Sequence, residues 1–551
     1  MENLPEGRPE QLQSALIAVL TRYPTTAERV AVVESILSGP AGPLWRRELG
    51  RWATWLVPVE ELVPESYRHW RPLVRDAMQF VVSHLSPSRL APKVVEQMEL
   101  PPGMPAEQRL LRLIAKVPGL QKIGQVLARN RHFEPRFRRA LSQLENGISD
   151  VGIEEIRAVV VRELGPLVES YGVRLDSRIY FEASVSAVVR FTWRNPETRH
   201  RERGVFKVLK PHIPICYAED MKILQKLAGA LARKYLDDRS RFSGFAEMLT
   251  EIRRFLQHEV DFRGEQRTLD AAQRLYGSAP GVRVPRLIAP LSTAVITALT
   301  HESGVKVTDA LRHQPAQRVR LARKLAETLL ALPAFSRQED AIFHGDPHAG
   351  NLLYDTRRGD LVILDWALTE HLGRQQRRLV TLLVLMTMLR DGDGVCSAIE
   401  DLRLHRSADS VRQAQVVRTA VDRFLSDLPL FYVPGPMDAL HLLDEVARPG
   451  IRFPASMLVF RKAAFTLDGV AADVAGAAVG MDSLLATYAL KHWRAAGMAL
   501  WSVLSPSDFI ALPWSALTLA PRLWMHALAS PLRWADRVAR DHAIAAAPTS
   551  G

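Results

Sequence analysis

One pair of short motifs constrains the fold of this chain more than any other feature. Residues His344–Asn351 have the sequence His-Gly-Asp-Pro-His-Ala-Gly-Asn, and Leu364–Ala367 have the sequence Leu-Asp-Trp-Ala. Two apolar-rich runs and a turn lie between the motifs, a pattern that predicts a β-hairpin. Because a hairpin folds back on itself, we expect Asp365 to return to the neighbourhood of Asp346 and Asn351. Three oxygen-bearing side chains would then converge, as a hard divalent cation requires.

The spacing of these residues favours the chemistry of kinase-like phosphotransferases. In such enzymes an Asp orients the attacking group, a following Asn binds Mg²⁺, and a further Asp holds the metal against the nucleotide phosphates. Asp346 is therefore the candidate catalytic residue, and Asn351 and Asp365 are the candidate metal ligands. The alternative is a surface loop rich in turn-forming residues, which the combination of motif, hairpin and second Asp disfavours. The implied cofactors are ATP or ADP together with Mg²⁺.

A site of this kind also needs a lysine on a strand, where it can reach the α- and β-phosphates. Residues Gly204–Lys210 form an apolar run with two lysines, and Pro211 ends it because proline cannot continue a central strand. Lys207 is the preferred candidate. Lys210 is the alternative, but it lies next to Pro211, at the end of the strand.

A kinase-like site further needs a glutamate on a helix that follows the lysine strand. The segment Phe245–Tyr276 has mostly helical spacing and no proline. It carries Glu259, Asp261 and Glu265, of which the last two are four residues apart and share a helical face. Acidic residues on helices are usually solvated, so these three residues indicate a function only in combination with the other motifs.

Together these motifs resemble those of the UbiB/AarF atypical kinase family, which is associated with isoprenoid quinone biosynthesis. The family's K-x-G-Q motif matches Lys122–Gln125. Its E-x-D motif matches Glu259 and Asp261, which the resemblance assigns to the nucleotide site, and its following glutamate matches Glu265. The catalytic and metal loops match the two motifs described above. The resemblance covers roughly residues 105–490.

The resemblance implies a role for each matched residue. Lys207 would pair with Glu265 and with the nucleotide phosphates, so both belong to the catalytic set. Lys122 is expected to form a salt bridge with Glu259, and Gln125 would hydrogen-bond within the same site. The K-x-G-Q helix would then cover the cleft in which a protein kinase admits a peptide. ATP hydrolysis or small-molecule phosphorylation is therefore favoured over a protein substrate.

Three positions depart from the family pattern, one of which is the hinge segment Thr297–Thr300, which lacks the acidic residue common there. In the loop where the family has A-A-A-S, only Ala183 and Ser184 match, and these two are assigned to nucleotide binding. Glu182 precedes them and would repel phosphates unless it turns away or holds a metal. The family's D-F-G is replaced by Asp365–Ala367, and Ala367 lacks the backbone freedom of glycine. No core catalytic group is lost.

The order of these elements predicts an α+β, bilobal protein kinase-like fold with a helical N-terminal extension, which carries the K-x-G-Q helix, and a helical C-terminal tail. With 551 residues the chain is long enough for more than one folding unit. The expected segments are a helical N-terminal region, the K-x-G-Q extension, a small lobe, a large lobe and the tail, at residues 1–105, 106–175, 176–300, 301–490 and 491–551.

Composition narrows the classes of partner and compartment. The two cysteines, Cys216 and Cys396, give no disulfide framework and no Cys-based zinc site, which favours a reducing compartment. The net charge of +12 permits binding to anionic lipid or nucleic acid. The charge is spread and no nucleic-acid motif accompanies it, so we do not expect nucleic acid as a partner. The first residues have no basic segment followed by an apolar run, so we expect no signal peptide.

The C-terminal tail suits either a membrane contact or packing on the core. No segment reaches the ~18 uncharged apolar residues of a spanning helix. Arginines and tryptophans among short apolar runs suit a membrane interface, the tryptophans being Trp493, Trp501, Trp514, Trp524 and Trp534. The same proline-broken runs would equally pack on a kinase-like core. The expected location is cytoplasmic, with the tail as a candidate peripheral contact on the inner face of the membrane.

Three functions remain open at this point. The first is an ATP- and Mg²⁺-dependent kinase or ATPase of UbiB type that supports isoprenoid quinone or lipid metabolism, with a small isoprenoid or phenolic lipid as partner. The second is a small-molecule phosphotransferase of the aminoglycoside or choline kinase type, since H-G-D-x-H-x-G-N also occurs there. The third is a non-enzymatic nucleotide-binding scaffold, which the altered phosphate loop suggests. The K-x-G-Q and E-x-D motifs favour the first, and the complete catalytic set disfavours the third.

Overall fold

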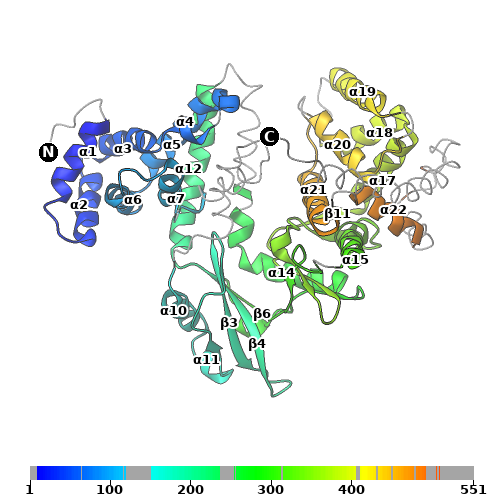
Figure 1. Cartoon of the computed structure of the whole chain (residues 1–551), viewed down its shortest axis with the longest axis horizontal. Helices are drawn as coiled ribbons and strands as arrows, with labels where there is room; N and C mark the ends of the chain where they lie inside the picture. The colour runs from blue at the N-terminus through cyan, green and yellow to red at the C-terminus, as the bar shows by residue number, and fades with distance from the viewer. Residues whose placement is uncertain are drawn as a thin grey trace, which may run out of the picture. The chain divides into compact units, whose positions relative to one another are not determined.

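The structure is a computed structural model of the whole chain (Figure 1). It describes residues 9–63, 65–115, 117–119, 151–235, 253–254, 256–311, 314–404, 410–429, 432–447, 451–476 and 479–491, with Leu504 and Asp508. The chain divides into two compact units. Unit 1 comprises Met1–Arg263 and Ile288–Thr300, and unit 2 comprises Gly264–Leu287 and His301–Gly551.

Unit 1 begins with helices that bury apolar stripes against one another. They are α1 (Pro9–Leu20), α2 (Thr26–Ser38), α3 (Gly42–Leu56), α4 (Val59–Leu62), η1 (Glu65–Trp70), α5 (Arg71–His84), α6 (Pro87–Glu99) and α7 (Ala106–Ile114). Thr25 starts α2 with a capping box, in which its side chain accepts from Glu28 N–H and the Glu28 carboxylate accepts in return. A Cβ on Gly50 would lie 2.7 Å from the Gln79 carbonyl oxygen, so α3 and α5 approach this closely only because glycine has no side chain.

An antiparallel sheet forms the second part of unit 1. Its strands are β1 (Arg174–Leu175), β2 (Phe181–Glu182), β3 (Ser186–Arg194), β4 (Arg201–Leu209) and β6 (Ile296–Thr300), in the order β1-β3-β4-β6 with β2 paired to β3. One face packs on α10 (Ile153–Leu164), beside which lies α11 (Leu167–Ser170) (Figure 1). Phe191 and Phe206 stack at the centre of this core with ring centroids 3.7 Å apart. Alternate residues on β3 and β4 are buried there, so the residues between them point to the other face.

A buried ion pair joins the N-terminal helices to α12 (Ile213–Lys234). Arg89 Nη1 lies 2.7 Å from Asp220 Oδ1, and the Gly119 backbone N–H donates to Asp220 Oδ2 at 2.7 Å. The neighbouring Glu219 accepts from the Ser86 backbone N–H at 2.6 Å. Burial raises the pKa of Asp220, while Arg89 and the Gly119 N–H oppose that shift. These contacts fix the chain at Gly119, immediately before the K-x-G-Q segment.

Unit 2 combines short strands with helices. Its strands are β5 (Val282–Arg283), β7 (Val305–Lys306), β8 (Asp340–His344), β9 (Leu352–Asp355), β10 (Asp360–Ile363) and β11 (Thr369–Gly373), forming a four-stranded sheet, β5-β10-β9-β7, and the pair β11-β8. Its helices are α14 (Phe262–Tyr276, of which the first two residues belong to unit 1), α15 (Pro315–Ala326), η4 (Glu327–Ala331), α16 (Leu332–Ala334), η5 (Ala349–Asn351), α17 (Arg374–Leu389), α18 (Gly392–Leu402), α19 (Ser410–Asp427), α20 (Pro436–Ala447), α21 (Ala455–Ala475) and α22 (Met481–Lys491).

The mixture of helices and sheets confirms the α+β class in its coarse form, and the predicted hairpin is present as β9 and β10. The bilobal arrangement and the segment boundaries stay predictions. The K-x-G-Q motif and most of the C-terminal tail lie outside the described residues. Within the described part of the chain, no helix is both long and apolar enough to cross a bilayer.

We predict that Asp220→Ala destabilises unit 1 by about 1–3 kcal/mol, because the substitution removes the nearer of two carboxylates from the buried Arg89, leaving Glu219 at 3.3 Å, and takes the acceptor from the Gly119 N–H. Thermal unfolding of the full chain measures the effect. The double variant Arg89→Met/Asp220→Leu should recover most of the loss. As a control, Glu48→Ala breaks the exposed Arg51–Glu48 pair and should cost less than about 1 kcal/mol. Equal losses for Asp220→Ala and Glu48→Ala would contradict the assignment.

Candidate active site

The β9–β10 hairpin of unit 2 brings the second motif back to the first. The strands pair antiparallel with Ile363 opposite Leu352, so Asp365 emerges beside the start of β9. The Asp355 side chain closes the turn by accepting from the backbone N–H groups of Arg357 and Arg358 at 3.0 and 3.3 Å. The hairpin is therefore specified by local chemistry at its far end.

A buried histidine joins the two motifs directly. His344 Nδ1 accepts from the Asp346 backbone N–H at 3.2 Å, so Nε2 carries the proton and donates to the Leu364 carbonyl at 3.0 Å. Burial lowers the pKa of His344 below 6.5, which keeps the ring neutral in this arrangement. His344 thus fixes the backbone on either side of the site, at Asp346 and next to Asp365.

Asn351 is oriented by the same network. Its Nδ2 donates to the Asp346 carbonyl at 3.1 Å, and its own carbonyl accepts from Leu364 N–H at 2.8 Å. Because the amide nitrogen is the donor, Oδ1 is the atom of this side chain suited to bind a cation. The structure therefore brings the segments of Asp346, Asn351 and Asp365 together, as the hairpin predicted.

The replacement of D-F-G is accommodated by the backbone of Asp365. Asp365 itself has a positive φ of 50°, whereas Ala367 is not among the positive-φ residues, so glycine is not needed at that position. Trp366 is buried, donates to the Ile363 carbonyl at 3.2 Å, and packs on Tyr276 and His344. The larger tryptophan therefore anchors the loop in the core.

The donor set suits Mg²⁺ held jointly with phosphates. Among the described residues, no group of three or more His, Cys, Asp or Glu side chains could hold a metal alone. Asn351 and Asp365 would supply an amide oxygen and a carboxylate, both hard donors. Mg²⁺ is typically bound through one or two such side chains, water and substrate phosphates. The residues present thus fit a magnesium–nucleotide site rather than a self-contained metal centre.

Glu265 lies near the start of α14 and is buried. On the same helix, Thr268 Oγ1 donates to the Trp366 carbonyl at 2.9 Å, which ties α14 to the loop of Asp365. Lys207 belongs to unit 1 and Glu265 to unit 2, and their pairing stays a prediction. Sequence reasoning did not assign roles to Thr268 or His344, although His344 belongs to the motif that identified the site.

The phosphate-binding candidates of unit 1 lie on the sheet face opposite its core. Lys207 is half-buried on β4, opposite Val188 of β3 and Thr297 of β6, and its Nζ is 5.8 Å from the centre of the Phe262 ring. Its place on a central strand agrees with the preference for Lys207 over Lys210.

Lys210 has a different setting. Lys210 is 1% exposed, and its Nζ lies 2.9 Å from Glu182 Oε1. The predicted repulsion between Glu182 and phosphates is therefore offset, because Lys210 pairs with the Glu182 carboxylate. The Lys210 backbone N–H also donates to Val185 at 3.0 Å, so the end of β4 holds both ends of the Ala183–Ser184 loop.

Ser184 connects that loop to the E-x-D motif. Its Oγ donates to Glu259 Oε2 at 3.1 Å, and the Ala183 N–H donates to the Ser186 carbonyl at 2.8 Å. Asp261 is exposed. Lys122 and Gln125 lie outside the described residues, so the predicted Lys122–Glu259 salt bridge stays a prediction.

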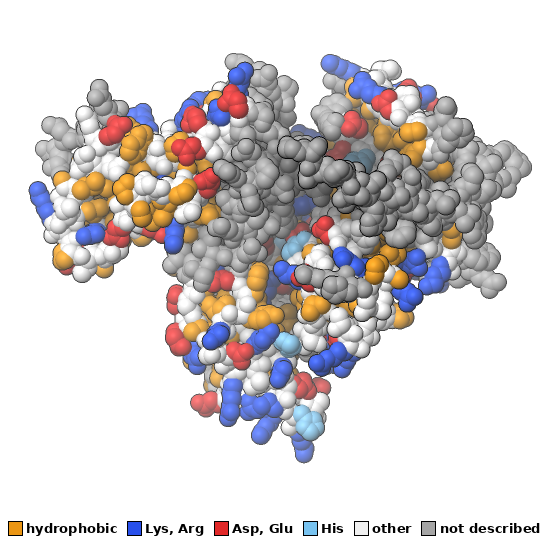
Figure 2. Space-filling view, in the orientation of Figure 1, with side chains coloured by type: hydrophobic (Ala, Val, Ile, Leu, Met, Phe, Trp, Pro, Cys, Tyr) orange, Lys and Arg blue, Asp and Glu red, His pale blue; other side chains and the backbone are white. Residues whose placement is uncertain are grey.

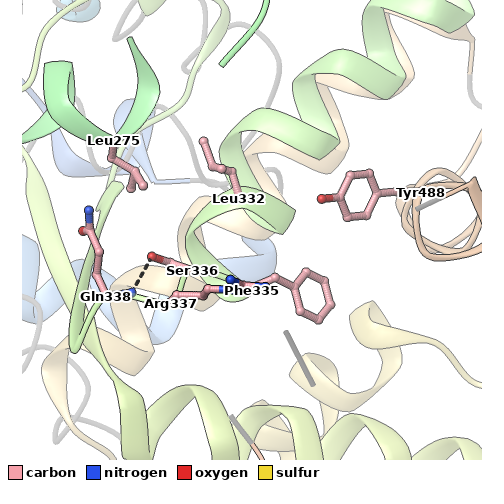
Figure 3. Close-up of a pocket in the computed structure, with 7 residues that line it drawn as sticks. All are labelled: Leu275, Leu332, Phe335, Ser336, Arg337, Gln338 and Tyr488. Atoms are coloured by element: carbon pink, nitrogen blue, oxygen red, sulfur yellow. Dashed lines mark hydrogen bonds between the residues drawn. The ribbon is translucent and has the colours of Figure 1, made fainter. Parts of the chain in front are cut away.

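Unit 2 also contains a cavity of about 440 Å³ (Figure 3). Its lining consists of Leu275, Leu332, Phe335, Ser336, Arg337, Gln338 and Tyr488. The Ser336 hydroxyl accepts from the Gln338 backbone N–H at 3.2 Å, and the rings of Phe335 and Tyr488 lie 6.4 Å apart. None of the candidate site residues lines it, so we assign it no part in the chemistry.

Comparison with known proteins agrees with this geometry. Residues 143–399 match the ABC1 atypical kinase-like domain, which confirms the resemblance found in the sequence. A relative from Arabidopsis thaliana, the chloroplastic protein Activity of bc1 complex kinase 7, is 24% identical over 64% of this chain and 50% of its own length. The probable protein kinase UbiB of Haemophilus ducreyi is 23% identical over 42% of each chain.

The matched segment thus spans half or less of these two relatives. Among solved structures, the complex of Rv3197 with erythromycin from Mycobacterium tuberculosis is 19% identical to this chain. It covers 65% of this chain and 87% of its own, with a TM-score of 0.42.

We predict that stability depends on the neutral form of His344. The pKa of His344 is lower in the folded state than in the unfolded state, so folding releases protons and stability falls as the pH drops below about 6.5. His344→Gln removes the titration and retains a donor and an acceptor. Thermal unfolding between pH 5.5 and pH 7.5 should therefore show a flatter profile for the variant than for the native chain. Parallel profiles would contradict this prediction.

Substitutions of Lys207 and Lys210 should have different effects on stability and on nucleotide binding. Lys210→Met removes the lysine of a buried ion pair with Glu182 and should cost about 3–5 kcal/mol of stability. Lys207→Met changes a half-buried residue and should cost less than about 1 kcal/mol, while it weakens nucleotide binding at least about tenfold. Thermal unfolding with and without Mg-ATP measures both quantities. The reverse assignment would follow if Lys207→Met were the more destabilising variant.

Proposed function

We propose that this chain is an atypical kinase or ATPase of the ABC1/UbiB type, dependent on ATP and Mg²⁺, that supports isoprenoid quinone or lipid metabolism. The observation that carries the proposal is the hydrogen-bond network of unit 2. His344 and Asn351 together hold the backbone of Asp346 and Leu364, which supports a shared site for the candidate base Asp346 and the candidate metal ligands Asn351 and Asp365.

Each residue has a distinct part in the proposed reaction. Asp346 orients the attacking hydroxyl or water and accepts its proton. Asn351 Oδ1 and the Asp365 carboxylate would hold Mg²⁺, which when bound neutralises phosphate charge. Lys207 neutralises the α- and β-phosphates, with Glu265 as its proposed partner. Ala183 and Ser184 form the phosphate loop, whose serine is held by Glu259.

The proposed acceptor is a small phenolic or isoprenoid lipid, with water as the acceptor in its absence. The reason is the K-x-G-Q motif, which in the resemblance places Lys122 and Gln125 over the region where a peptide would enter. A cytoplasmic location, with peripheral contact of the tail on the inner face of the membrane, belongs to the same proposal. Nucleotide turnover measured with and without a quinone-head-group phenol and membranes tests it, and a phosphorylated peptide product would contradict it.

Asp365→Asn should weaken Mg-ATP binding by about tenfold or more, because a neutral amide is a poorer ligand for Mg²⁺ than a carboxylate. The thermal stabilisation of the chain by Mg-ATP measures this. Asp360→Asn is a matched control in the same hairpin, where Asp360 pairs with Arg283 at 3.3 Å. It should leave Mg-ATP stabilisation intact. Unchanged stabilisation in Asp365→Asn would remove Asp365 from the metal site.

Asp346→Asn should retain nucleotide binding and lose most turnover, by about 10²–10⁴-fold, because the amide cannot accept the proton of the attacking group. Binding is followed by thermal stabilisation and turnover by phosphate release. Retained turnover would make Asp346 structural and would favour the non-enzymatic scaffold.

A further inference from the structure

Arginines gather on the solvent-facing side of the unit 1 sheet, away from its α10 core. The register aligns Arg174 of β1, Thr192 of β3 and Arg203 of β4 in one row across the strands, and places Arg194 opposite Arg201 in the next. All four arginines are exposed, and Figure 2 shows basic side chains concentrated over the β3–β4 hairpin. We call Arg174, Arg194, Arg201 and Arg203 the arginine face.

Within the described part of the chain, the arginine face is not neutralised by acidic side chains. Among the described residues, no carboxylate forms an ion pair with any of its four members, and Arg201 donates instead to Thr192 Oγ1 at 3.0 Å. The nearby Glu202 accepts from Asn195 and Thr198. By contrast, arginines of the N-terminal helices do pair with carboxylates, as Arg51 does with Glu48 at 2.7 Å. Like charges directly opposite each other weaken a sheet, so folding stability does not account for this pattern.

Aromatic side chains border the same face. Phe181 of β2 lies opposite Val188, on the same side of the sheet as the arginines, and is 47% exposed. The guanidinium of Arg190 lies 3.7 Å from the ring centre of the exposed Tyr180. This stacking covers one face of Tyr180, which disfavours its use as a platform for nucleic-acid bases. Exposed apolar rings beside unpaired cations are the side chains that settle at the boundary of an acidic bilayer.

We propose that the arginine face, with Phe181 at its edge, binds the surface of an anionic phospholipid bilayer. The four arginines carry like charge and are exposed, as attraction to an anionic surface requires, and they outnumber the exposed Asp176, which follows β1 and whose N–H donates to the Arg190 carbonyl at 2.9 Å. Each arginine near such a surface contributes about fivefold to partition, so loss of two should lower it about 25-fold. The arginine face is on the same side of the sheet as Lys207, but its four arginines lie toward the β3–β4 turn and none is a candidate site residue. Vesicle binding measured without nucleotide can therefore fail or hold independently of the proposed function.

Sedimentation of the full-length chain with vesicles tests the proposal without nucleotide. The vesicles are phosphatidylcholine alone, or equal parts of phosphatidylcholine and phosphatidylglycerol. We expect binding to the anionic vesicles that weakens with salt and falls about 25-fold in Arg194→Gln/Arg201→Gln. That variant should be at least as stable as the native chain, because it removes a like-charge pair. Phe181→Ser should weaken the part of the binding that survives at high salt.

The matched control is Arg51→Gln/Arg75→Gln, which removes the same charge from paired arginines of α3 and α5. It should leave vesicle binding within about twofold of the native chain, because these arginines already have carboxylate partners. The proposal is overturned by equal losses in the two double variants, or by equal binding to both kinds of vesicle. It is also overturned if Arg194→Gln/Arg201→Gln weakens binding to single-stranded RNA and leaves vesicle binding unchanged, which would make nucleic acid the partner of this surface.

Discussion

The candidate site depends on one neutral imidazole. His344 accepts from the backbone of Asp346 and donates to that of Leu364, and only the neutral ring can do both. Burial maintains this state by lowering the pKa of His344. A protonated ring would turn an acceptor into a second donor facing the Asp346 N–H. The position of the catalytic candidate relative to the metal loop therefore rests on the protonation state of a residue that need not touch substrate.

In unit 1, an ion pair affects the loop that is the candidate for phosphate binding. In the proposed function the loop of Ala183 and Ser184 accepts anionic phosphates, yet Glu182 precedes it. A buried ion pair with Lys210 matches that carboxylate, and Ser184 is held by Glu259. The exposed arginines of the same sheet differ, because no described carboxylate pairs with any member of the arginine face. Within one sheet, buried charge is paired and exposed charge is left for a partner.

The sequence predicted those features that follow from local chemistry. The β9–β10 hairpin could be foreseen because its turn residues and apolar runs are contiguous, and the place of Lys207 followed from Pro211, which ends its strand. The Glu182–Lys210 pair could not be foreseen, because it depends on the pairing of β2 and β4 with β3, which brings residues distant in the sequence together. The sequence also could not predict that alanine is accommodated at position 367, because the positive φ of this loop occurs at Asp365 instead.

The arginine face shows why register matters for function. In the sequence its members are scattered among many other arginines, and a net charge of +12 distinguishes no surface. Only the pairing of β1, β3 and β4 aligns them on one side. Charge that looks spread along a chain can thus be concentrated by a sheet.

The most direct test of the central claim is the position of the metal. A crystal structure of the chain with Mn²⁺ and a non-hydrolysable ATP analogue would locate the ion by its anomalous signal. The account predicts one ion bound by Asn351 Oδ1 and the Asp365 carboxylate, at about 2.0–2.3 Å, and bridging the phosphates. An ion bound with the nucleotide at other side chains, with Asn351 and Asp365 both outside its coordination sphere, would contradict it.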